Sequence, residues 1–129
     1  MSIVNLRRVL LVALGGTTGT AARLGLGLVL PDDRLPVAVF AANILGALLI
    51  GILTARLPQP TELRIFLGTG ILGGFTTYSA LATGTIALWR DIPALAVGYG
   101  IGSLALGVAA AALGLRLGRR RGVLPEARR

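Results

Sequence analysis

The sequence predicts an all-α membrane protein with four transmembrane helices, the third of them broken near its middle. The 129 residues are 54% hydrophobic, with a mean hydropathy of +0.81, which is too apolar for a small soluble domain. The apolar residues fall into four blocks, each close to the ~20 residues that cross the hydrocarbon core as a helix. Glycines and hydroxyl side chains interrupt the third block, and we expect that helix to break there.

We expect residues 1–129 to form a single four-helix transmembrane domain. The first span, 9–30, is interrupted only by Arg23. The arginines and short apolar run at its start also fit a signal peptide, but the apolar sequence resumes after Leu24 and makes a full span. The second span, 37–55, follows a polar connection with prolines at its edges, which stop and restart helices.

The third span, 63–89, follows a polar loop in which Thr61 is a candidate helix N-cap. It ends at Trp89, beside Arg90, a pairing that suits the membrane interface. The fourth span, 94–115, leads into an arginine-rich tail, 116–129.

The arginines predict the topology. Four spans place both termini on one side of the membrane. The arginines on that side are Arg7, Arg8, Arg56, Arg64 and those of the tail. Only Arg34 and Arg90 lie on the other side, so the positive-inside rule makes both termini cytoplasmic. Basic ends that flank apolar spans account for the net charge of +8 through orientation and lipid contact, and we expect no nucleic-acid partner.

The polar groups inside the spans favour an anion as cargo. They are Thr17, Thr18, Thr20, Arg23, Asn43, Thr69, Thr76, Thr77, Tyr78, Ser79, Thr83, Thr85, Tyr99 and Ser103. Each can donate a hydrogen bond, and none is a carboxylate, whereas proton-coupled pumps usually carry Asp or Glu at membrane depth. The chain has neither cysteine nor histidine, so thiolate metal sites are excluded and an enzyme is not expected.

Several of these residues have two interpretations. Arg23 either extends to the outer interface or forms a vestibule that attracts anions. Asn43 either joins two helices by a hydrogen bond or lines an ion path. Tyr99 and Ser103 share one face of the fourth helix and either hold helices together or line the path. The segment 68–73 matches G-x-G-x-x-G, but no strand is predicted before it, so we reject nucleotide binding.

Three motifs mark the first three spans: Gly15-Gly16-x-x-Gly19-x-x-x-Arg23, Asn43-x-x-Gly46 and Gly73-Gly74-x-Thr76-Thr77-x-Ser79, with Tyr99 and Ser103 in the fourth helix. In these motifs, and over nearly the whole chain, the sequence resembles the small fluoride channels called Fluc or CrcB. The resemblance implies a passive channel that exports fluoride from the cytoplasm across the bacterial cell membrane and relieves fluoride toxicity.

The resemblance also implies an antiparallel dimer with a structural Na⁺ at its centre. The ion would be held by the backbone carbonyls of Gly73 and Thr76. The implied fluoride path comprises Asn43, Thr77, Tyr78, Ser79, Leu81, Tyr99 and Ser103, with Arg23 as the vestibule cation.

The chain departs from the family pattern at a pair of phenylalanines, whose places Tyr78 and Leu81 take, and at a fourth-helix serine, replaced by Gly107. An aliphatic side chain offers no positive aromatic edge to an anion. The arginine bias favours one membrane orientation, so we expect a heterodimer with an oppositely inserted paralogue, with a homodimer as the alternative. Two other functions stay open: a non-conducting subunit that completes a partner's channel, and a small four-helix multidrug transporter, which would need a glutamate in its first span.

Overall fold

The computed structural model describes residues 3–30 and 35–120. Three spans are continuous helices: α1 (Ile3–Val29), α2 (Val37–Arg56) and α6 (Pro93–Arg120). The third span comprises α3 (Glu62–Arg64), the π-helix η1 (Ile65–Leu72), α4 (Gly73–Phe75) and α5 (Tyr78–Asp91). All four spans are long and apolar enough to cross a membrane, which confirms the predicted fold class of a multi-pass helical protein.

The boundaries differ from the predicted ones mainly at the basic ends. The helix α1 begins before Arg7, and α6 continues to Arg120, so the first arginines of the expected tail are helical. Thr61 caps α3 as expected, since its hydroxyl accepts a hydrogen bond from the backbone N–H of Arg64 at 3.2 Å. Residues 31–34 of the expected loop at 31–36, and the tail from residue 121, lie outside the described residues.

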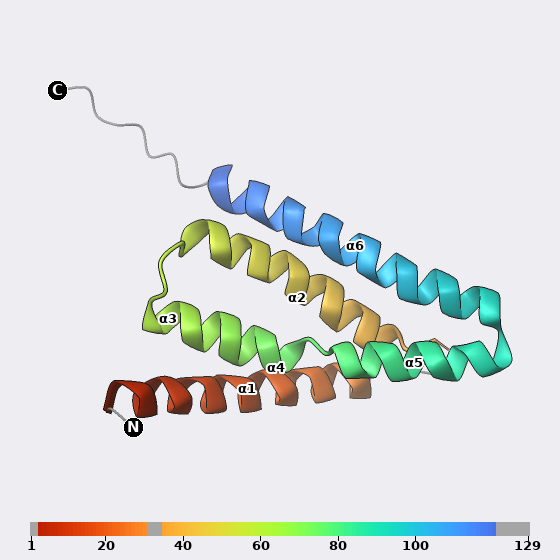
Figure 1. Ribbon diagram of the computed structural model, residues 1–129, viewed down its shortest axis with the longest axis horizontal. Coiled ribbons are helices and arrows are strands. Elements are labelled where there is room, and N and C mark those ends of the chain that lie inside the picture. Colours follow the sequence, from red (N-terminus) through yellow and green to blue (C-terminus); the bar gives the residue numbers. More distant parts are fainter. Residues whose placement is uncertain (1–2, 31–34, 121–129) are drawn as a thin grey trace.

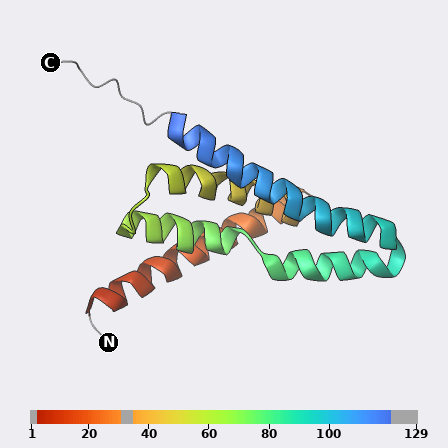
Figure 2. The same ribbon diagram turned by 45° about the horizontal axis from the view of Figure 1, so that its top comes forward.

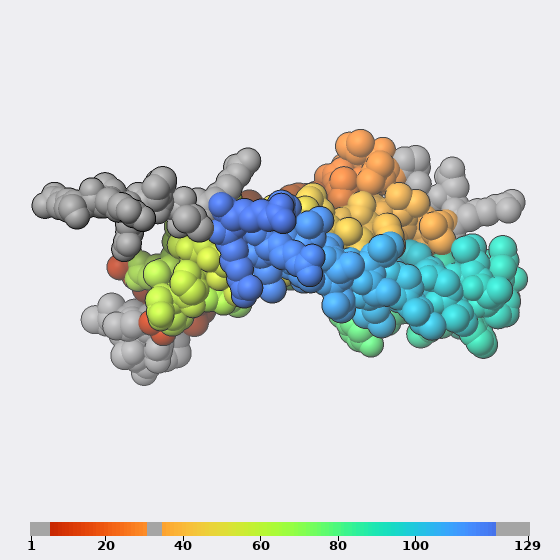
Figure 3. Space-filling view, turned by 90° about the horizontal axis from the view of Figure 1, so that it is seen from above, coloured from red at the N-terminus to blue at the C-terminus, as the bar shows by residue number. Residues whose placement is uncertain are grey.

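The helices form two packed pairs that the broken third span connects. The helix α2 packs along α6, and α1 packs along η1 and α4 (Figure 1). After the break, α5 leaves α1 and packs against α6; the unwound link between α4 and α5 is clear in Figure 2. Seen from above, α6 runs along most of the length of the molecule (Figure 3).

Glycines account for the close approach within both pairs. A Cβ atom on Gly19 or Gly74 would collide with the backbone of the facing helix, so α1 and the third span pack backbone to backbone. Gly51 and Gly114 do the same for α2 and α6. Close helix packing therefore accounts for glycines in all four spans, although a Cβ on Gly25 or Gly27 of α1 would meet no atom of the described chain. A Cβ on Gly98 would likewise meet no atom of the described chain.

The basic residues gather at one end of the bundle. The first turns of α1, the last turns of α2 and α6, and α3 lie together at the left of Figure 1. An ion pair of 2.8 Å between Arg7 of α1 and Glu62 of α3 joins two of these elements. The side of the membrane that this end faces stays a prediction.

Large apolar side chains cover the outside of the molecule. Leu28 is 89% exposed and Val108 is 72% exposed, while the few buried apolar residues are three alanines with Leu81, Leu88 and Tyr99. Such an inverted distribution would be unfavourable in water and is the one expected for helices in lipid.

Candidate functional site: the break in the third span

The third span unwinds at Thr76 and Thr77, two residues beyond the glycine pair. Both threonines have extended backbone conformations, with φ and ψ of −82° and 155° at Thr76 and of −152° and 119° at Thr77. Gly73 and Gly74 themselves remain helical. The glycines therefore do not cause the break by adopting an unusual conformation; Gly74 instead allows α1 to approach, because a Cβ there would collide with the backbone of Gly16.

Hydrogen bonds from side chains replace the helical bonds that the break removes. In a continuous helix the N–H of Thr77 would bond to the carbonyl of Gly73, and the N–H of Ala80 to that of Thr76. Here the Thr77 N–H donates to Asn43 Oδ1 at 2.8 Å, and the Ala80 N–H donates to Thr77 Oγ1 at 3.3 Å. The carbonyl oxygens of Gly73 and Thr76 accept no hydrogen bond from the described residues.

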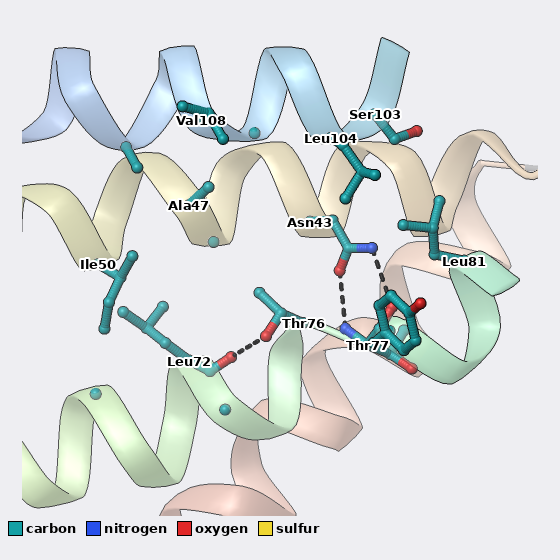
Figure 4. A pocket seen from close by; sticks show the side chains of 16 residues that line it. Asn43, Ala47, Ile50, Leu72, Thr76, Thr77, Leu81, Ser103, Leu104 and Val108 are labelled. Carbon is teal, nitrogen blue, oxygen red and sulfur yellow. Dashed lines mark hydrogen bonds between the residues drawn. The ribbon is translucent and has the colours of Figure 1, made fainter. Parts of the chain in front are cut away.

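Asn43 holds the unwound residue from the facing helix α2. Its Nδ2 donates to the Thr77 carbonyl at 3.0 Å while its Oδ1 accepts from the Thr77 N–H (Figure 4). The side-chain amide thus pairs with both backbone groups of one residue, and only one orientation of the amide satisfies both bonds. Because unpaired backbone groups are costly at membrane depth, this pairing stabilises the break. It matches the interpretation of Asn43 as a bond between helices, and Asn43 also lines the adjoining cavity.

Gly46, one turn after Asn43, makes room for the other unwound residue. A Cβ on Gly46 would collide with the methyl group of Thr76. The Thr76 hydroxyl donates to the Leu72 carbonyl at 2.9 Å, which fixes the direction of that methyl group (Figure 4). The Asn43-x-x-Gly46 motif therefore contacts both unwound threonines.

Arg23 and Thr20 of α1 bind the C-terminal end of α4. The Gly74 carbonyl accepts hydrogen bonds from Thr20 Oγ1 at 3.3 Å and from Arg23 Nε at 3.4 Å. A cation is favourable beside the C-terminal carbonyls of a helix. Arg23 is thus directed at the break in this structure, rather than at the outer interface.

An open cavity of about 510 Å³ lies beside the break. It runs between α2, α6 and the third span, as Figure 4 shows. Predicted site residues on its wall are Asn43, Gly73, Thr76, Thr77, Tyr78, Leu81 and Ser103. The rest of the wall is apolar or glycine, including Ala47, Leu104, Gly107 and Val108. No sequence motif identified Ala47, Leu104 or Val108, because only the packing of α2 against α6 brings them together.

The aromatic and hydroxyl residues predicted for the path have different surroundings. Tyr78 is 79% exposed, and Ser79 is exposed beside Thr77, with 3.2 Å between their hydroxyl oxygens. Leu81 is buried in a cluster with Tyr99. The Tyr99 hydroxyl donates to the Pro36 carbonyl at 3.2 Å, and Tyr99 does not line the cavity.

Ser103 is the buried polar residue of this region. It is 5% exposed, and its Oγ has no hydrogen-bond partner among the described residues. A hydroxyl in that position can still bind a small ligand that enters the cavity. The cavity thus offers hydrogen-bond donors and no carboxylate.

Comparison with known proteins agrees with this architecture. A family model described as "CrcB-like protein, Camphor Resistance (CrcB)" matches residues 10–115. The fluoride-specific ion channel FluC of Paracoccus denitrificans (strain Pd 1222) is 44% identical over 113 residues, 84% of this chain and 91% of that protein. A FluC of Thermus thermophilus is 44% identical over 121 residues, 88% and 96% of the two chains. FluC 2 of Rhodococcus jostii (strain RHA1) is 46% identical over 112 residues, which cover 84% of this chain and 96% of that protein. The chain belongs to the CrcB-like protein family.

Proposed function

We propose that this chain is a subunit of a passive fluoride-selective channel that exports fluoride from the cytoplasm. The observation that carries the proposal is the cavity at the break, where Asn43, Thr77 and Ser103 offer donors without a carboxylate. The relatives named fluoride-specific ion channels support fluoride as the ion. The proposal includes no catalytic step and no multidrug substrate.

Donors at the break favour an anion for electrostatic reasons. The helix α5 begins there, and the first N–H groups of a helix carry partial positive charge. Arg23 adds a full positive charge at the neighbouring Gly74 carbonyl. A small anion that loses part of its water shell needs such donors in place of water. We therefore assign the fluoride path to Asn43, Thr77, Tyr78, Ser79, Leu81 and Ser103, with Tyr99 as their packing support and Arg23 as the vestibule cation.

The exposed polar residues at the break support a dimer. Tyr78 and Ser79 lie near the middle of the third span and are exposed in the isolated chain, where lipid would leave the Tyr78 hydroxyl unsatisfied. An antiparallel partner would cover this face and complete the path.

A structural Na⁺ would fit the same face. Among the described residues, the carbonyls of Gly73 and Thr76 lack donors because Asn43 and Thr77 divert the N–H groups that would bond to them. Carbonyl oxygens are hard ligands that suit a small alkali cation, and the described residues hold no cluster of acidic side chains that would serve instead. The Na⁺ would supply a positive charge that draws the two subunits' carbonyls together.

The partner that we propose is a paralogue inserted in the opposite orientation, with both termini of this chain in the cytoplasm. The arginine bias toward one end of the bundle supports a fixed orientation. Relatives named FluC 2, such as that of Corynebacterium jeikeium, indicate that some organisms have more than one such protein. Single cysteines introduced near either terminus of this cysteine-free chain would test it. Labelling from one side only is expected, and equal labelling from both sides would exclude a fixed orientation.

Fluoride efflux from liposomes tests the function itself. The purified chain, alone and then together with a paralogue from the same genome, is reconstituted in vesicles loaded with potassium fluoride. Fluoride release, read with a fluoride electrode and exceeding chloride release, is expected in at least one of the two preparations. Release from the chain alone would indicate a homodimer. Absence of release from both preparations would contradict the proposal and leave a non-conducting subunit as the alternative.

A further inference from the structure

A second cavity, of about 460 Å³, lies closer to the basic end of the bundle. It is open to the outside and lies between the end of α2, the loop after it and the start of the third span. Its wall consists of Ile50, Thr54, Pro60, Arg64, Ile65, Gly68 and Thr69. Ile50 and Gly68 also line the cavity at the break, so the two cavities are neighbours that share these residues.

Two hydroxyl groups on this wall are free to bind a ligand. The Oγ1 atoms of Thr54 and Thr69 take part in no hydrogen bond among the described residues. Every other threonine of the chain has one: most bond to the carbonyl four residues earlier, as Thr17 does to Ala13 at 2.8 Å. Back-bonding of this kind is the usual way for a threonine to satisfy its hydroxyl in a membrane helix. The two exceptions line the same cavity.

Arg64 supplies a fixed positive charge beside these hydroxyls. Its Nη1 donates to the carbonyls of Leu57 at 2.9 Å and Pro58 at 2.6 Å, which holds the guanidinium at the loop after α2. These bonds use one nitrogen, while Nε and Nη2 have no partner in the described part of the chain. Arg64 forms no ion pair there either, because the neighbouring Glu62 pairs with Arg7. Its charge is therefore available to a ligand.

The π-helix brings the polar groups to one side. Hydrogen bonds from residue i to i+5 widen the turn, so Thr69 lies one turn after Arg64 instead of being rotated away. Thr54 faces them from α2 across the cavity. A guanidinium and two hydroxyls, without a carboxylate on the wall, form a donor set for a small anion.

We propose that this second cavity binds a small monovalent anion before the anion passes Ile50 and Gly68 to reach the cavity at the break. Arg64 raises the local anion concentration, and the hydroxyls of Thr54 and Thr69 bind the ion. That the anion is fluoride rests on the proposed function, whereas anion binding at this cavity does not.

Cysteine protection tests the cavity directly. The chain has no cysteine, so Thr54→Cys and Thr69→Cys each introduce a single thiol into it. The thiol is reacted with a sulfonate-bearing methanethiosulfonate reagent, in fluoride or in gluconate at equal ionic strength. Fluoride should slow both reactions at least about threefold, and the anionic reagent should react faster than its trimethylammonium counterpart by ~10-fold, as in a positively charged cleft. Thr17→Cys on α1, which lines neither cavity, should show no protection.

The effect should depend on Arg64. Adding Arg64→Gln should abolish the preference for the anionic reagent, and the protection measured with Arg64 intact remains informative if that variant does not fold. Equal rates in fluoride and gluconate at both positions, or equal protection at the control position, would overturn the proposal. If fluoride protects the thiols but vesicles release no fluoride, the anion site stands and the proposed function fails. If vesicles release fluoride but fluoride protects neither thiol, the proposed channel function stands and the anion site is rejected.

Discussion

Replacement of Asn43 by leucine should destabilise the protein by about 1–3 kcal/mol. Leucine has a similar size but removes both hydrogen bonds to Thr77, of 2.8 and 3.0 Å, and so leaves the N–H and carbonyl of the unwound residue unpaired. Hydrogen bonds between side chains and helices in membranes contribute ~0.6 kcal/mol on average and up to ~1.7 kcal/mol, and two are lost here. Asn43→Asp should cost at least as much, because it places a carboxylate oxygen against the Thr77 carbonyl.

The free energy of unfolding is measured by SDS titration in mixed micelles. Thr17→Val serves as the matched control, because its hydroxyl bonds only within its own helix, and it should change stability by less than ~0.5 kcal/mol. Hydrogen exchange at the Thr77 amide gives a local measure: it should be protected in the wild-type chain and faster in Asn43→Leu. Unchanged stability together with unchanged exchange in Asn43→Leu would refute the role assigned to Asn43.

Three further substitutions test the packing around the break with the same SDS titration. Gly46→Ala should lower the free energy of unfolding by ~1–3 kcal/mol, because the added methyl displaces Thr76 and breaks the hydrogen bond from its hydroxyl to the Leu72 carbonyl. An unchanged free energy of unfolding would mean that the unwound link between α4 and α5 has room to move. Ser103→Ala should leave the free energy of unfolding unchanged or raise it by up to ~1 kcal/mol, since it removes a hydroxyl that has no partner among the described residues, yet it should lower fluoride efflux; a destabilised protein would contradict that reading of Ser103. Gly74→Leu should separate α1 from the third span and prevent stable folding, while Gly98→Leu, which points into open space, should be tolerated; equal effects would contradict the packing.

The helices were predictable because the membrane imposes a simple length requirement. Four apolar blocks of sufficient length correspond to the four spans, and the hydroxyl cluster at 76–79 predicted a break in the correct region. The residue at which the helix unwinds was not predictable from local sequence. Gly73 and Gly74 have the higher intrinsic tendency to disrupt a helix, but the position of α1 requires Gly74 for close packing. The π-helical geometry of η1 was not predicted either, since no local residue pattern specifies it.

The site could be predicted as a set of residue types but not as a set of contacts. The absence of carboxylates in the spans predicted an anion, and this required only composition. The partner of Asn43 lies 34 residues away, and the sequence did not indicate that its amide would pair with a backbone. Tyr99 was expected on the path, yet its hydroxyl bonds to Pro36, because the start of α2 packs against α6 at that position. Whether Tyr78 faces a partner depends on a second subunit and remains a prediction.

Current recordings in a planar bilayer test the central claim most directly. The chain, with its paralogue if the liposome experiment requires one, is placed between solutions that differ tenfold in fluoride. A passive fluoride channel predicts a current that reverses near ~59 mV, the equilibrium potential of a monovalent ion at that gradient. The potential should move to zero when fluoride is made equal on both sides while a chloride gradient is kept. A reversal potential that follows chloride, or a bilayer without current despite fluoride efflux from vesicles, would contradict passive fluoride conduction.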